Sequence, residues 1–324
     1  MLGAIAWGLG ATALVWGQRV LRASRRAGRF RTRFPTGDDE IVDGAEPRTF
    51  HAPGRRALLL LHGYNDSPQS LDQVARVIHA SGWTVRLPLL PGHGRSLDAF
   101  DSWTREDLLT AARAEYTALR ETHSTVVVGG LSMGGAIACW LAAESEAAGV
   151  VLFAPMLFVP RPMEIAVTTA RLWSLFSRFM SGGGARSIRD PEAARAMIAY
   201  GASSRRSLEA LEKVCRHTTA RLGFIHVPVL VIQSEEDNRL PRDQSVRAIA
   251  RIGSDDKTVI WTQGAGHVLT VDYGWQEVAA TAARWLAERF PEPRGGPRDE
   301  SRGESSGETR RDGDARIASP PASG

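Results

Sequence analysis

Short apolar runs alternate with segments of helical periodicity across the central part of the chain. Most of the runs are apolar along their whole length, as is typical of strands covered on both faces of a sheet. The predicted strands are 57–61, 83–88, 125–129, 149–154, 229–233 and 257–262. Between them, apolar residues recur every three or four positions, which predicts helices. The main predicted helices are 68–80, 104–121, 133–146, 242–251 and 274–289. This alternation favours an α/β fold with a mostly parallel sheet.

One stretch, residues 156–225, interrupts the alternation. It shows no convincing strand but contains amphipathic pieces, including 163–180 and 206–222. We interpret it as a helical cap inserted into the α/β domain. Within it, residues 181–191 contain three consecutive glycines, which cannot hold a helix and therefore predict a flexible joint.

The N-terminal region, residues 1–33, differs in composition from the rest. Residues 1–17 carry no charge, and extending this run through Leu21 gives a helix of about 30 Å, barely enough to span a bilayer. Seven Arg follow the apolar run rather than precede it, which favours a retained membrane anchor, with the Arg-rich side and the main domain in the cytoplasm. Two alternatives are a surface helix held to anionic lipid and a soluble cytoplasmic protein. If the segment is an anchor, deleting residues 1–33 should release a folded, active protein.

The other end, residues 291–324, is dense in Gly, Pro, Ser and mixed charge, and Ile317 is its only large apolar residue. This composition predicts a disordered tail, which leaves 34–290 as the folded domain. The net charge of +4 comes from the Arg-rich N-terminus, so the near-neutral body argues against a nucleic-acid partner. The two cysteines are too few for a disulfide scaffold and lack metal-site spacing.

The strongest chemical motif is Gly130-Leu131-Ser132-Met133-Gly134, which lies between a predicted strand and a predicted helix. A G-x-S-x-G turn in this context lifts the serine hydroxyl clear of the sheet edge, where it can act as a nucleophile. The plain alternative is an ordinary helix-capping serine. We expect Ser132 to be a nucleophile.

A serine nucleophile needs an imidazole to take its proton and a carboxylate to orient that imidazole. His267 follows the last predicted strand in a Gly-rich loop and precedes a helix. Glu235, Glu236 and Asp237 follow the strand before it. One of the three is expected to supply the carboxylate, and the short side chain of Asp237 suits the turn that leads into Pro241.

The oxyanion formed on an attacked carbonyl needs two preorganised donors. The backbone N–H of Met133, directly after the serine, is one candidate, and the N–H of Tyr64, in the loop after the first apolar strand, is the other. His62 and His93 lie in turn-rich loops, and we interpret both as structural residues.

Together these segments resemble the α/β-hydrolase superfamily, and within it the bacterial carboxylesterase and monoacylglycerol lipase group. The resemblance covers residues 50–290 and rests on LLLLHGYNDSPQSL, LPLLPGHGRS, GGLSMGG, PVLVIQSEEDNRLP and GAGHVLTVD. It implies an α/β-hydrolase sheet of about eight strands beneath a helical cap. It also implies Ser132 as nucleophile, Asp237 as acid, His267 as base, and oxyanion donors at Tyr64 and Met133.

The expected function is hydrolysis of carboxylic esters through an acyl-enzyme, with no cofactor and no metal. Apolar cap residues, chiefly Leu172, Trp173 and Phe176, suggest an acyl-chain pocket and a lipid-like substrate such as a monoacylglycerol. The alternative for these residues is that they only hold the cap to the body. The same triad could also serve a thioesterase, an acyltransferase or a carbon-carbon bond hydrolase. A non-catalytic binding protein would be expected to lack a triad member, and none is missing.

Overall fold

The computed structural model of the protein describes residues 18, 30, 34–36, 40–181 and 187–292. Outside these described residues lie all of the predicted membrane segment except Gln18, residues 182–186 of the predicted joint at 181–191, and all but the first two residues of the predicted tail. Within the described part of the chain, no helix combines the length and apolar composition that crossing a bilayer requires.

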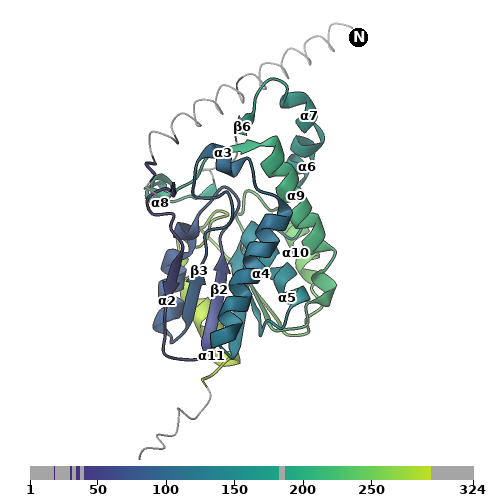
Figure 1. The fold of residues 1–324 in the computed structure, drawn as a ribbon. Coiled ribbons are helices and arrows are strands. Elements are labelled where there is room, and N and C mark those ends of the chain that lie inside the picture. The colour runs from purple at the N-terminus through teal and green to yellow at the C-terminus, as the bar shows by residue number, and fades with distance from the viewer. Residues whose placement is uncertain (1–17, 19–29, 31–33, 37–39, 182–186, 293–324) are drawn as a thin grey trace, which may run out of the picture. The chain divides into compact units, whose positions relative to one another are not determined.

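A seven-stranded sheet forms the centre of the described residues (Figure 1). In spatial order its strands are β1 (Arg48–Phe50), β3 (Thr84–Leu87), β2 (Arg56–Leu61), β4 (Thr125–Leu131), β5 (Val150–Phe153), β8 (Val229–Ser234) and β9 (Lys257–Thr262). All neighbours are parallel except β1, which pairs antiparallel with β3. All six predicted strands are confirmed, and the α/β class with them. The sequence did not predict the edge strand β1. It has only three half-buried residues, which is too short for an alternation of apolar and polar positions to be recognised.

Two layers of helices cover the sheet, which explains why its strands are apolar on both faces. On one face lie α2 (Asp72–Ala80) and α11 (Trp275–Arg289). On the other lie α4 (Arg105–Thr122), α5 (Met133–Glu144) and α10 (Arg242–Ala250). Alternate residues of β2 serve the two layers: Leu58 and Leu60 pack with the first, Leu59 and Leu61 with the second. The short helices η1 (Pro68–Leu71) and α3 (Leu97–Phe100) lie in connecting loops.

The inserted cap lies above the sheet edge at which β4 ends (Figure 1). The helices α6 (Arg161–Thr168), α7 (Ala170–Trp173) and α8 (Pro191–Ala196) belong to this region, whereas α9 (Arg205–Thr219) and η3 (Leu222–Phe224) also pack against α5 in the body. The prediction that this stretch lacks strands is wrong, because β6 (Phe179–Ser181) and β7 (Ala202–Ser204) form a small antiparallel pair. Each has three residues, and their pairing partners are about twenty residues apart, so no local period reveals them.

The chain before β1 also contacts the folded body. Phe30 is only 4% exposed, and its ring centroid lies 4.3 Å from that of Tyr200 in the cap. The Tyr200 hydroxyl in turn donates to the carbonyl of Arg95 and accepts from its N–H, at 2.9 Å each. A truncation at residue 33 would remove a buried aromatic side chain, so residue 29 is the better place to cut.

Candidate active site

Ser132 occupies the sharp turn between β4 and α5. Its φ of 54° lies in the left-handed region, which is strained for a residue with a side chain. The turn brings α5 so close to β2 that a Cβ atom at Gly134 would lie 1.9 Å from the carbonyl oxygen of Leu61. Only glycine fits there, so the G-x-S-x-G spacing has a direct steric cause.

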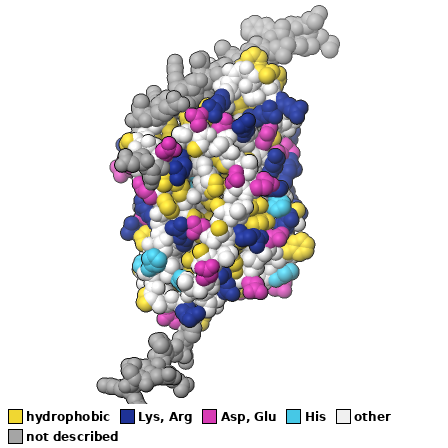
Figure 2. Space-filling model, viewed as in Figure 1, with side chains coloured by type: hydrophobic (Ala, Val, Ile, Leu, Met, Phe, Trp, Pro, Cys, Tyr) yellow, Lys and Arg dark blue, Asp and Glu magenta, His cyan; other side chains and the backbone are white. Residues whose placement is uncertain are grey.

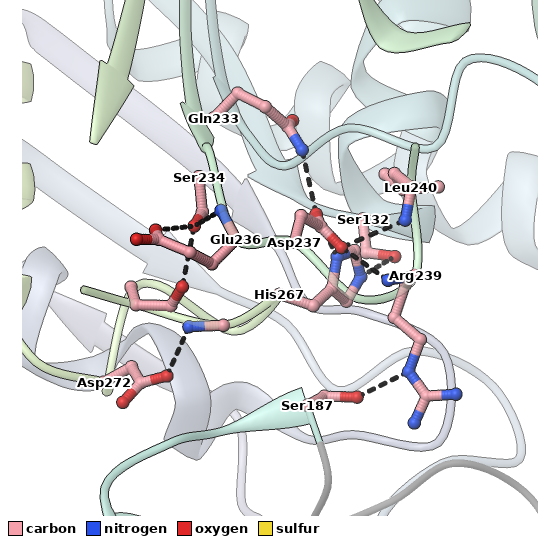
Figure 3. Close-up of polar contacts among 12 residues, drawn as sticks. Ser132, Ser187, Gln233, Ser234, Glu236, Asp237, Arg239, Leu240, His267 and Asp272 are labelled. Carbon is pink, nitrogen blue, oxygen red and sulfur yellow. Dashed lines mark hydrogen bonds and ion pairs between the residues drawn. The ribbon is translucent and has the colours of Figure 1, made fainter. Parts of the chain in front are cut away.

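His267 and Asp237 meet Ser132 at the carboxyl ends of three parallel strands (Figure 3). The Nε2 atom of His267 lies 2.9 Å from the Oγ of Ser132. The Nδ1 atom of the same imidazole lies 2.8 Å from Oδ2 of Asp237. The three side chains therefore form one continuous hydrogen-bonded chain, with the imidazole in the middle. This is the geometry that lets an imidazole take a proton from a serine hydroxyl.

The carboxylate of Asp237 is held ionised by its surroundings. Its side chain is 1% exposed, and Oδ1 accepts from the backbone N–H of Arg239 and Leu240 at 2.7 and 3.0 Å. Burial alone would raise the pKa of Asp237, but the His267 imidazole and these hydrogen bonds together lower it below its ordinary value. A charged Asp237 can orient His267 and stabilise its protonated form.

The two other acidic candidates lie elsewhere. Glu235 is exposed and pairs with Arg242 at 2.6 Å. Glu236 accepts from the backbone N–H of Gly264 at 3.0 Å and so braces the loop before His267. Of the three acids left open by the sequence, only Asp237 contacts the imidazole in the described residues.

The proposed oxyanion donors lie at the start of α5 and in the loop after β2. Met133 is the first residue of α5, so its N–H has no partner within the helix. Tyr64 follows Gly63, and a Cβ atom at Gly63 would lie 3.6 Å from the Cβ of Ser132. The Tyr64 hydroxyl lies 2.8 Å from the Oγ of Ser207 in α9, which ties this loop to the cap.

His62 is a structural residue of the same loop, as predicted. Its Nε2 lies 3.0 Å from the backbone N of Leu90, from which it accepts, and its Nδ1 lies 2.9 Å from the carbonyl oxygen of Gly63. Burial and the neighbouring His93 lower the pKa of His62 well below its usual value, so the ring is neutral near pH 7. His93 is also buried, with Nδ1 2.9 Å from the carbonyl oxygen of Pro91.

The sequence did not predict a role in the site for two polar residues that lie near it. Gln233, 1% exposed within β8, donates to Oδ2 of Asp237 at 2.8 Å. Asp66 accepts from the N–H of Gly63 and the hydroxyl of Ser70, and burial raises its pKa to about 6. A polar residue in an otherwise apolar strand could have revealed Gln233, whereas no local signal distinguishes Asp66 from an ordinary turn residue.

The three predicted pocket residues do not share one environment. Leu172 and Phe176 are 66% and 67% exposed on the outside of the cap. Trp173 is buried in a small cluster with Ala170 and Leu208, and its indole donates to the carbonyl of Ala166 at 2.9 Å. In the described structure Trp173 thus holds cap helices together, and the acyl pocket stays a prediction.

Fold and site together define an α/β-hydrolase. The family described as serine aminopeptidase, S33, matches residues 52–273, and the chain belongs to this family. The predicted membership of the α/β-hydrolase superfamily is confirmed.

Two curated relatives extend the comparison. A thermostable monoacylglycerol lipase of Bacillus sp. (strain H-257) is 29% identical over 72% of this chain and 90% of its own length. A carboxylesterase of Bacillus subtilis (strain 168) is 24% identical over 70% of this chain and 90% of its own.

Solved structures agree on the fold. A structure from work on LipS and LipT, two metagenome-derived lipolytic enzymes, superposes with a TM-score of 0.71 and 26% identity, covering 76% of this chain and 99% of that one. The monoacylglycerol lipase of Paleococcus ferrophilus gives a TM-score of 0.65 at 20% identity, covering 75% and 98%.

Proposed function

We propose that this carboxylic ester hydrolase cleaves monoacylglycerols or related acyl esters, with Ser132, His267 and Asp237 as its catalytic triad. The observation that carries the proposal is the unbroken chain from Ser132 Oγ through both imidazole nitrogens to Asp237, at 2.9 and 2.8 Å. The similarity to a monoacylglycerol lipase and a carboxylesterase supports the substrate class.

In the first half of the reaction, Ser132 Oγ attacks the ester carbonyl while His267 Nε2 takes its proton. The carbonyl oxygen becomes an oxyanion, which the N–H groups of Tyr64 and Met133 stabilise. The C–O bond to the alcohol then breaks as His267 returns the proton to the leaving oxygen. The acyl group remains on Ser132 as an ester, and the alcohol departs.

In the second half, a water molecule takes the place of the alcohol. His267 removes a proton from the water as its oxygen attacks the acyl carbon. The bond to Ser132 Oγ then breaks, and the same proton returns to the serine. The net products are one alcohol and one carboxylic acid. Asp237 stays ionised throughout and stabilises the imidazolium formed in each half.

An exposed apolar surface at the tip of the cap suits a substrate delivered from lipid. It comprises Ile165, Leu172, Leu175 and Phe176, each more than half exposed, and Arg171 is exposed beside it. Hydrophobic side chains are visible at this end of the molecule in Figure 2, where Figure 1 places α6 and α7. Apolar groups flanked by a cation favour contact with a lipid surface.

We expect the protein to hydrolyse a series of chromogenic esters with acyl chains from two to sixteen carbons, and to release glycerol from a monoacylglycerol. The chain length with the highest kcat/KM reports the depth of the acyl pocket. The matched control is Ser132→Ala, which should be inactive on every ester. A folded wild type that cleaves thioesters or amides but none of these esters would overturn the ester assignment.

We also expect residues 1–29 to bring the enzyme to membranes. Full-length protein should sediment with the membrane fraction, and a variant lacking residues 1–29 should stay in the supernatant with unchanged kcat. This variant keeps Phe30, which packs against Tyr200. Release of full-length protein by high salt would favour peripheral binding through the N-terminal Arg residues, five of which lie within 1–29, over a spanning anchor. Full-length protein that is soluble at low salt would refute membrane association.

A further inference from the structure

Asp272 is a buried carboxylate to which the proposed mechanism gives no role. It lies five residues after His267 and is 0% exposed. Both of its oxygens accept hydrogen bonds from backbone N–H groups. Within the described part of the chain, no Arg or Lys forms an ion pair with it, and backbone N–H groups are the donors seen at both oxygens.

The donors come from two segments that are far apart in the chain. From the loop of His267, Gly266 N lies 2.6 Å from Oδ2 and Tyr273 N lies 2.8 Å from Oδ1. From the segment that returns from the cap, Arg189 N lies 2.8 Å from Oδ2 and Asp190 N lies 2.9 Å from Oδ1. One carboxylate thus joins the residue directly before the imidazole to the base of the cap.

The same cap segment also contacts the loops of both partners of Ser132 (Figure 3). The Ser187 carbonyl accepts from the N–H of Val268, directly after His267, at 3.1 Å. The Ser187 hydroxyl accepts from Nε of Arg239 at 2.7 Å, and the Arg239 N–H donates to Asp237. The backbone on each side of His267 is therefore bonded either to Asp272 or to Ser187.

The close approach of this segment depends on Gly266. A Cβ atom at that position would lie 2.5 Å from the carbonyl oxygen of Ser187 and 3.3 Å from Oδ2 of Asp272. The loop is therefore shaped so that the cap segment and the Asp272 carboxylate both reach its backbone. This arrangement constrains the position from which the His267 side chain projects.

We propose that Asp272 is a positioning residue, which acts through the backbone of Gly266 to hold the His267 imidazole between Ser132 and Asp237. The inference rests on the proposed function, because it assigns His267 the role of base. The imidazole must satisfy two distances at once, and displacement by about 1 Å can cost about 10²-fold in rate. The proposal also implies that residues 187–190 of the cap help to fix the positions of the His267 and Asp237 loops.

The test compares Asp272→Asn with the wild type on the best ester of the series. An amide keeps one oxygen but directs an NH₂ group at two of the four N–H donors, so the loop should shift. We expect kcat to fall about 10²-fold with KM nearly unchanged. We also expect the far-downfield proton resonance of the His267 Nδ1–H to weaken or disappear while the circular dichroism spectrum is retained.

The matched control is Asp107→Asn, which alters a carboxylate that accepts the backbone N–H of Thr104 at 2.8 Å at the start of α4. It should leave kcat and the imidazole resonance unchanged. If Asp272→Asn does not fold, Asp272→Glu takes its place, because it keeps a carboxylate but its longer side chain moves the oxygens relative to the four N–H donors. We expect a decrease in kcat of about 10-fold for that variant.

The two proposals can fail separately. A folded Asp272→Asn protein with normal kcat and a normal imidazole resonance, but a lower melting temperature, would show a purely structural role and overturn this inference. If the wild type itself cleaves no ester, the proposed function fails. The resonance, and the rate at which a serine-directed phosphonate labels Ser132, then still test Asp272.

Discussion

Replacing Ser132 with alanine is expected to lower kcat by about 10⁶-fold, because losing the nucleophile removes the acyl-enzyme route altogether. The Oγ of Ser132 is the atom that lies 2.9 Å from the His267 imidazole. Release of chromophore from the preferred ester measures the effect. The variant should also resist labelling by a serine-directed phosphonate, which modifies the wild type.

The matched control for this variant is Ser245→Ala in α10. Ser245 is buried, and its hydroxyl has no hydrogen-bond partner among the described residues. Removing that hydroxyl should leave kcat unchanged, which separates loss of the nucleophile from the general effect of deleting a buried hydroxyl. If Ser132→Ala retained the wild-type kcat while folded, the proposed mechanism would be refuted.

Replacing Asp237 with asparagine is expected to lower kcat by about 10⁴-fold with little effect on the fold. The amide is nearly the same size, but it carries no charge to stabilise the imidazolium. It can also donate to Nδ1 of His267, which leaves the proton on Nε2, where the imidazole can no longer accept one from Ser132. Steady-state kinetics on the preferred ester provide the measurement.

Glu235→Gln and Glu236→Gln are the controls, since the sequence leaves these residues open as the acid. Glu235 pairs with Arg242, and Glu236 bonds to the N–H of Gly264, so neither contacts the imidazole. Both variants should keep kcat within a few-fold of the wild type. A large loss in either of them, with Asp237→Asn nearly normal, would assign the acid elsewhere.

The elements that sequence reasoning predicted correctly depend on local physical chemistry. The apolar runs of β4 and β8 match burial on both faces of the sheet, and the stripe of α11 matches packing on one face. The turn at Ser132 has its own local signal, because glycine is required where α5 passes β2. Such features lie within a few residues of the sequence that causes them.

The features that the sequence did not reveal depend on contacts between distant segments. Strands β6 and β7 are short and pair only because the cap folds back on itself. Trp173 has the composition of a pocket residue but lies in the core of the cap, while Phe176 beside it is exposed. Which way each side chain faces follows from the packing of the cap on the body.

By itself, the sequence determined the α/β class and six strands of the sheet, and it predicted the order of the proposed nucleophile, acid and base, because periodicity and turn chemistry act over a few residues. Only the tertiary structure decided that Asp237 rather than Glu235 or Glu236 meets His267, and that Asp272 joins the cap to the loop of His267. Glu235, Glu236 and Asp237 share nearly the same sequence context after β8, so local patterns do not distinguish them. Only the packing of loops from different strands places one of them within hydrogen-bond distance of a given imidazole.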